Sequence, residues 1–127
     1  MVTDKEKKVI QAYVDAYNHF DLPTMLSCLD ENVVFQKVAA DVVDTETVGI
    51  AAFKALAEET EGLYSSRELK ILGWDKKAQK VIVRINCHVT LNVDLPSGLK
   101  TGSPLDIRDV FEFVVRDGKI AEIIDRS

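Results

Sequence analysis

The sequence contains little cysteine, proline or glycine and has no long apolar run. Its 127 residues include two cysteines, three prolines, six glycines and one tryptophan. No apolar stretch approaches the roughly 20 residues that span a membrane, and the polar start "MVTDKEKKVIQ" lacks the apolar core of a secretory signal. We therefore expect one soluble cytoplasmic domain, residues 1–127, with no membrane partner.

An excess of positive charge is also missing. Lysine and arginine number 16 against 21 aspartates and glutamates, a net charge of −5, and the two signs are interspersed. Such a chain has no basic stripe for phosphate groups, so we expect no nucleic-acid partner.

Motifs for metals, cofactors and nucleophiles are absent as well. Cys28 and Cys87 are far apart, show no metal-ligand spacing and are interpreted as buried thiols. His19 and His88 have no second histidine at ligand spacing. No glycine-rich phosphate loop or exposed-serine elbow is found. We expect no metal and no cofactor.

The first half of the chain predicts three helices. Thr3 followed by Glu6 is a capping-box pattern and begins a helix over about residues 3–20. Asp21 can cap a short second helix, and a third is expected over about residues 49–62. Two short strands, in "VVFQKV" and "VDTETVG", are predicted between the second and third helices.

The second half reads as four antiparallel strands. "KVIVRINCHVTLNVDL" alternates apolar and polar residues, and Asp117-Gly118 predicts the last hairpin turn. Helices early and strands late indicate an α+β fold in which helices cover one face of a curved antiparallel sheet. A cavity is expected where helices and sheet meet. The polar outer face is open either to solvent or to a second copy of the chain.

Asp109 does not fit its predicted strand. In "DIRDVFEFVVR" it shares the apolar face with Ile107, Phe111 and Phe113. A carboxylate there must be solvated at a rim, paired with a cation, or protonated in an apolar pocket. Asp109 is therefore the strongest candidate for a functional residue.

Three stretches carry a resemblance to a known family: "AYVDAYNHFDLPTMLSCLDENVVF", "VGIAAFKALAEE" and "DVFEFVVRDGKIAEIIDR". With the order of elements, they resemble the nuclear transport factor two-like superfamily and, within it, the SnoaL-like polyketide cyclases and the ketosteroid isomerases. The resemblance implies a cystatin-like cone, in which a strongly curved antiparallel sheet wraps around N-terminal helices. It also implies an apolar pocket and a homodimer.

The resemblance further implies roles for single residues. The isomerases use a carboxylate base on the first strand and an oxyanion hole made of a tyrosine and a protonated aspartic acid. By position these fall on Lys37, Tyr13 and Asp109, so the carboxylate base is missing. Lys37 could act as a base, form a Schiff base, or pair with Asp109. Asp41 or Asp44 in the following loop could replace the base.

We expect the pocket to hold a small hydrophobic ligand. Besides the three residues just named, its expected lining is Val14, Tyr17, Phe35, Phe53, Trp74 and Phe111. Three functions stay open: an isomerase or cyclase-like lyase that transfers protons on a small hydrophobic carbonyl compound, a non-catalytic ligand-binding domain, and a structural module with a filled pocket. A homodimer would use the outer sheet face.

Overall fold

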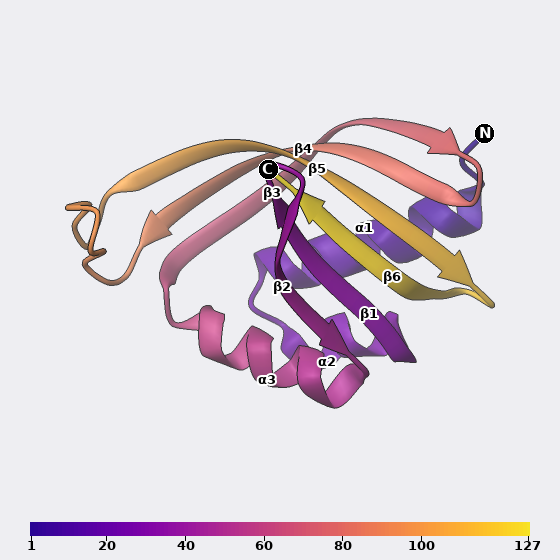
Figure 1. Cartoon of the computed structure of the whole chain (residues 1–127), viewed down its shortest axis with the longest axis horizontal. Coiled ribbons are helices and arrows are strands. Elements are labelled where there is room, and N and C mark those ends of the chain that lie inside the picture. Colours follow the sequence, from indigo (N-terminus) through magenta and orange to yellow (C-terminus); the bar gives the residue numbers. More distant parts are fainter.

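The computed structural model describes residues 1–127 as three helices and six strands (Figure 1). The elements are α1 (Asp4–Asn18), α2 (Leu22–Ser27), β1 (Leu29–Ala39), β2 (Val42–Val48), α3 (Ile50–Glu61), β3 (Tyr64–Lys77), β4 (Lys80–Leu91), β5 (Pro104–Arg116) and β6 (Lys119–Arg126). This order confirms the predicted succession. β1 begins at Leu29, earlier than the predicted start at Val33.

The capping box at the start of α1 is present. Thr3 Oγ1 accepts a hydrogen bond from the Glu6 backbone N–H at 3.1 Å, and Glu6 Oε1 accepts one from the Thr3 N–H at 2.9 Å. Two N–H groups that lack helical partners are thus satisfied. The apolar stripe of α1, with Ile10 and Tyr13, is buried beneath the sheet.

The six strands form one curled sheet in the order β2-β1-β6-β5-β4-β3, which arches over the helices (Figure 1). All neighbouring strands are antiparallel except β1 and β6, which run parallel. The sheet is therefore mixed, whereas the sequence predicted an antiparallel one. The difference arises because the hairpin with β5 fixes the direction of β6, which then lies beside β1.

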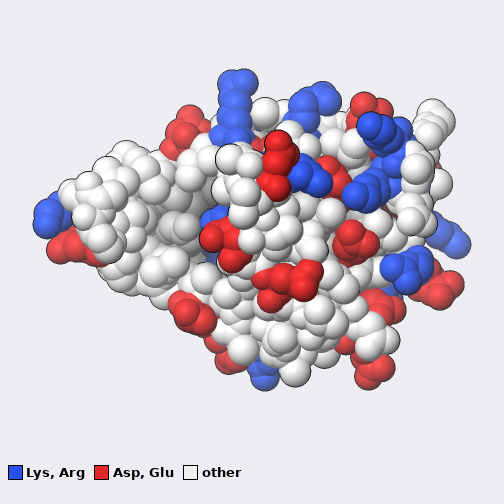
Figure 2. All heavy atoms as spheres, viewed as in Figure 1, with Lys and Arg blue, Asp and Glu red and all other residues white.

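A core of 19 buried residues lies between the helices and the inner face of the sheet. On β4, buried and more exposed residues alternate as predicted, and Cys28 and Cys87 are buried free thiols. No helix is both long enough and apolar enough to cross a membrane. Acidic and basic side chains are interspersed on the face shown in Figure 2.

Candidate functional site

A cavity of about 320 Å³ lies between the helices and the inner face of the sheet, and most of the residues that line it are hydrophobic. Aromatic rings form much of its wall. The Phe35 and Phe53 rings meet edge to face with centroids 5.8 Å apart, and the Tyr13 ring lies 6.4 Å from Phe53. The cavity can therefore accept a small apolar molecule.

Two carboxyl groups, Asp109 on β5 and Asp125 on β6, line this apolar cavity. In the β5–β6 register Asp125 lies opposite Phe111, two residues along β5 from Asp109, so both face the inner side of the sheet. The Oδ1 atoms of both are buried and have no hydrogen-bond partner. Buried carboxyl oxygens without a hydrogen-bond partner are uncommon in a folded protein, so Asp109 and Asp125 are candidate functional residues.

The pKa values of the two carboxyl groups are both shifted upward. Burial raises the pKa of Asp109 above its ordinary value, and the positive charge of Lys37 partly offsets that rise. Burial, together with the negative charge of Asp109, raises the pKa of Asp125 to about 6. Two interacting acids titrate as a pair. Asp125 is therefore mostly neutral, and able to donate a hydrogen bond, at pH values below about 6.

Lys37 also lines the cavity but is exposed, so it lies at the mouth. It is paired in register with Asp125 on the neighbouring strand. It forms no ion pair within 4.0 Å with any carboxylate. The salt bridge with Asp109 that the sequence left open is therefore not formed, and Lys37 acts on the two acids through space.

Two tyrosines of α1 reach the cavity. Tyr13 is 4% exposed, and its ring packs edge-on against Phe113 with centroids 6.1 Å apart. Tyr17 follows one turn later and also lines the cavity. Burial raises the pKa of both hydroxyl groups well above the ordinary range, so both stay neutral. A neutral phenol can donate a hydrogen bond to a ligand.

Other predicted pocket residues separate into two groups. Val14 lies within the core and Trp74 lies beneath the Lys7 ammonium, 5.8 Å from its ring centroid, so neither lines the cavity. Val14 is turned away because adjacent helical residues face different directions. Asp44 lines the cavity, whereas Asp41 lies in the β1–β2 turn. The predicted residues that do line it are Tyr17, Phe35, Phe53 and Phe111.

Asp125 is the site residue that the sequence did not predict, and a β-bulge explains why. From the turn, Val115 pairs with Ile120, but Val114 pairs with Glu122, so Ala121 is one extra residue on β6. Without this bulge Asp125 would lie opposite Val110 on the outer face. A one-residue shift of register exchanges the two faces of a strand. Only a sequence signal for the bulge could have revealed Asp125.

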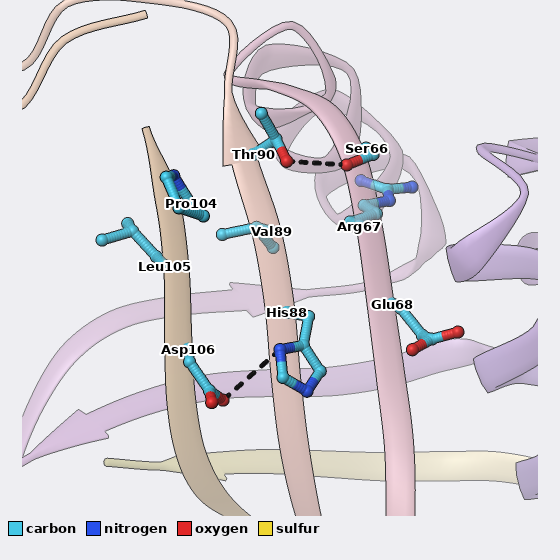
Figure 3. Close-up of a pocket in the computed structure, with 9 residues that line it drawn as sticks. All are labelled: Ser66, Arg67, Glu68, His88, Val89, Thr90, Pro104, Leu105 and Asp106. Carbon is cyan, nitrogen blue, oxygen red and sulfur yellow. Dashed lines mark hydrogen bonds and ion pairs between the residues drawn. The ribbon is translucent and has the colours of Figure 1, made fainter. Parts of the chain in front are cut away.

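A second hollow, of about 580 Å³, lies on β3, β4 and β5 (Figure 3). Ser66 Oγ donates to Thr90 Oγ1 at 3.0 Å, and His88 Nδ1 lies 3.6 Å from Asp106. His88 and Asp106 are exposed, on the polar outer face where the alternation predicted His88. No group of three or more histidine, cysteine or acidic side chains could hold a metal ion. The inner cavity is the stronger candidate site because Asp109 and Asp125, each with one buried carboxyl oxygen, lie among mostly hydrophobic residues.

Comparisons with known proteins agree with this architecture. The SnoaL-like domain family matches residues 10–123. Among solved structures, a candidate polyketide cyclase from Xanthomonas campestris pv. campestris has a TM-score of 0.80 at 23% identity, over 97% of this chain and 90% of that chain.

Two further structures share the fold. IdmH from Streptomyces antibioticus, another candidate polyketide cyclase, has a TM-score of 0.78 at 17% identity, over 97% of this chain and 91% of that one. An LEH-like epoxide hydrolase from M. tuberculosis has a TM-score of 0.76 at 17% identity, over 98% of this chain and 83% of that chain. No curated protein matches the chain. The match over residues 10–123 shows that the chain belongs to the SnoaL-like domain family.

Proposed function

We propose that this protein catalyses proton transfer on a small, largely apolar carbonyl compound, as an isomerase or as a cyclase that closes a ring by aldol addition. The observation that carries the proposal is the pair of carboxyl groups, Asp109 and Asp125, which line a mostly apolar cavity and each have one buried oxygen without a hydrogen-bond partner. Groups with shifted pKa values in a cleft are typical of catalytic acids and bases.

The pair supplies both halves of an acid–base mechanism. Neutral Asp125 donates a hydrogen bond to the carbonyl oxygen of the substrate, while the Asp109 carboxylate takes a proton from the adjacent carbon. The product of this step is an enolate, whose oxygen accepts hydrogen bonds from Asp125 and from Tyr13 as a second donor. Asp109 then returns its proton to a different carbon, which completes an isomerisation. Alternatively, the enolate carbon attacks a second carbonyl of the same molecule, and Asp109 gives its proton to the alkoxide oxygen that forms.

These roles differ from those suggested by the sequence. Asp109, first considered as the donor, becomes the base, because burial and the charge of Asp109 raise the pKa of Asp125 to about 6 and so favour Asp125 as the proton donor. Lys37 then favours the ionised form of Asp109 at the mouth of the cavity. General acid–base catalysis contributes about 10²–10⁴-fold, and one donor to a developing oxyanion contributes about 10²–10³-fold.

Family membership supports this class of reaction, since two structures of the same fold carry polyketide cyclase names. The LEH-like epoxide hydrolase of the same fold suggests a second candidate. One neutral and one ionised carboxyl group could also add water to an epoxide: Asp125 would protonate the epoxide oxygen while Asp109 takes a proton from the attacking water. The Asp109–Asp125 pair is the observation that favours it.

The test is proton exchange in D₂O. The wild-type protein, Asp109→Asn and Asp125→Asn are incubated with cyclic β,γ-unsaturated ketones, and NMR follows deuterium incorporation and double-bond migration. Styrene oxide hydrolysis is measured in parallel. We expect each substitution to lower the rate at least 100-fold, while Asp106→Asn on the outer face leaves it unchanged.

The outcomes separate the functions. Exchange that survives both asparagine substitutions would exclude the carboxyl pair as the catalyst. Hydrolysis of the epoxide without ketone exchange would favour the second candidate. Binding without either reaction would identify a ligand-binding domain instead of an enzyme.

A further inference from the structure

A second charged group lines the cavity apart from the carboxyl pair. Arg67 on β3 is 8% exposed and is the one charged residue among the buried residues of the chain. β3 forms one edge of the sheet, two strands from β5 and its Asp109. The guanidinium is held between two rings: its Cζ lies 3.8 Å from the centroid of Tyr17 and 4.2 Å from that of Phe20.

The hydrogen bonds of Arg67 are incomplete. Its Nε donates to the Tyr17 carbonyl oxygen at 2.6 Å. No carboxylate oxygen lies within 4.0 Å of the guanidinium, although Asp44 and Glu61 line the same cavity. The two terminal nitrogens, which carry four of the five N–H donors of an arginine, have no protein partner. These nitrogens are not among the fully enclosed polar atoms that lack a partner, so they stay accessible to a ligand. A guanidinium with free N–H donors and no counter-ion can bind an anion.

We propose that Arg67 is the anion-binding group of the cavity and that the ligand is a small apolar carboxylic acid. A carboxylate matches the planar fork of a guanidinium with two parallel hydrogen bonds. The rings of Tyr17 and Phe20 hold the fork in one plane, so it is oriented before the ligand arrives. The acid group binds at β3, and the remainder of the molecule extends toward Asp109. The inference rests on the proposed function only in taking the cavity as the substrate site.

A purely structural role for Arg67 predicts different behaviour. The Tyr17 carbonyl belongs to the last turn of α1, where a positive charge is favourable. That role needs only Nε and the charge, and it leaves the terminal nitrogens unused. Arg67→Lys keeps the charge but removes the fork, and Arg67→Gln removes both. A structural role would change stability in these variants without changing which ligands bind.

The test measures binding of matched acids and amides by isothermal titration calorimetry. The probes are 3-phenylpropanoate, 2-naphthoate and decanoate, each beside its primary amide, with wild-type protein, Arg67→Lys, Arg67→Gln and the outer-face control Arg84→Gln. We expect at least one acid to bind the wild type and Arg84→Gln about 10- to 100-fold more tightly than its amide. The preference should fall to about twofold or less in Arg67→Gln and be reduced in Arg67→Lys. Circular dichroism checks folding, and Arg67→Lys alone decides if Arg67→Gln does not fold.

Two results would overturn the proposal. In the first, the wild type binds none of the three acids or prefers none of them over its amide. In the second, the preference for an acid survives in the folded Arg67 variants. Asp109→Asn separates this inference from the proposed function, because it should keep the acid preference while losing proton exchange. A preference without exchange leaves Arg67 as the anion-binding group of a ligand-binding domain. Proton exchange on neutral ketones without a preference for acids would contradict the Arg67 proposal and leave the proposed function standing.

Discussion

At the scale of the residue, Asp125 links burial to a dependence of stability on pH. Its folded-state pKa of about 6 lies above the ordinary 3.8. The folded state therefore holds the proton more tightly, and the associated stability is present below pH 4 and lost as pH rises through 6. We predict that Asp125→Asn is more stable than wild type at pH 8, by on the order of 2 kcal/mol, and that the gain disappears below pH 4. Urea denaturation at both pH values measures this. The exposed Asp106→Asn should show no comparable gain, and a gain that persisted at low pH would contradict the raised pKa.

Coupling between the two acids gives a second prediction at this scale. Removing the charge of Asp109 removes one cause of the raised pKa of Asp125 but leaves its burial. In Asp109→Asn the Asp125 carboxyl should therefore titrate below its wild-type pKa of about 6 but above an ordinary aspartic acid. Carboxyl ¹³C chemical shifts followed across pH report this directly. An unchanged titration of Asp125 would mean that the two carboxyl groups do not interact.

At the scale of the element, α1 brings Tyr13 and Tyr17 to the cavity, and its first turn depends on the capping box. We predict that Thr3→Ala lowers the free energy of unfolding by about 1 kcal/mol, because the Glu6 N–H loses its acceptor. Thr3→Ser, which keeps the hydroxyl, should retain most of that stability. Thermal denaturation compares the two variants. Equal losses in both would show that the hydroxyl group does not stabilise the helix.

The same scale shows how far the sequence can predict this molecule. Periodicity, helix caps and β-forming residues together predicted every helix and strand, and alternation placed Asp109 on the inner face, because all these signals come from residues close together along the chain. The bulge at Ala121 and the parallel pairing of β1 with β6 arise from contacts between distant segments. β6 also carries buried residues on both faces, such as Ile123 and Ile124, so it shows no clean alternation. Asp125 was therefore missed although Asp109 was found.

At the scale of the whole molecule, assembly remains a prediction. We expect a homodimer through the outer sheet face, where Arg84 is exposed on β4. Charge reversal there, in Arg84→Glu, should shift the protein toward monomer, because a like-for-like interface repeats each change twice. Lys54→Glu on the exposed side of α3 should not. Sedimentation equilibrium gives the mass of each variant. A monomeric wild type would rule out the homodimer.

The central place of β6 has a consequence for how the chain is synthesised. β6 is the last of the nine elements, yet it is the strand that joins β2-β1 to β5-β4-β3. Phe35 on β1 pairs with Ile123 on β6, which lies 88 positions later along the chain. Pairings of such high contact order slow folding, and until this one forms, two partial sheets expose unpaired edges that invite aggregation. Until β6 has been synthesised, the chain has neither a complete sheet nor Asp125, so the candidate site forms only after this strand is made.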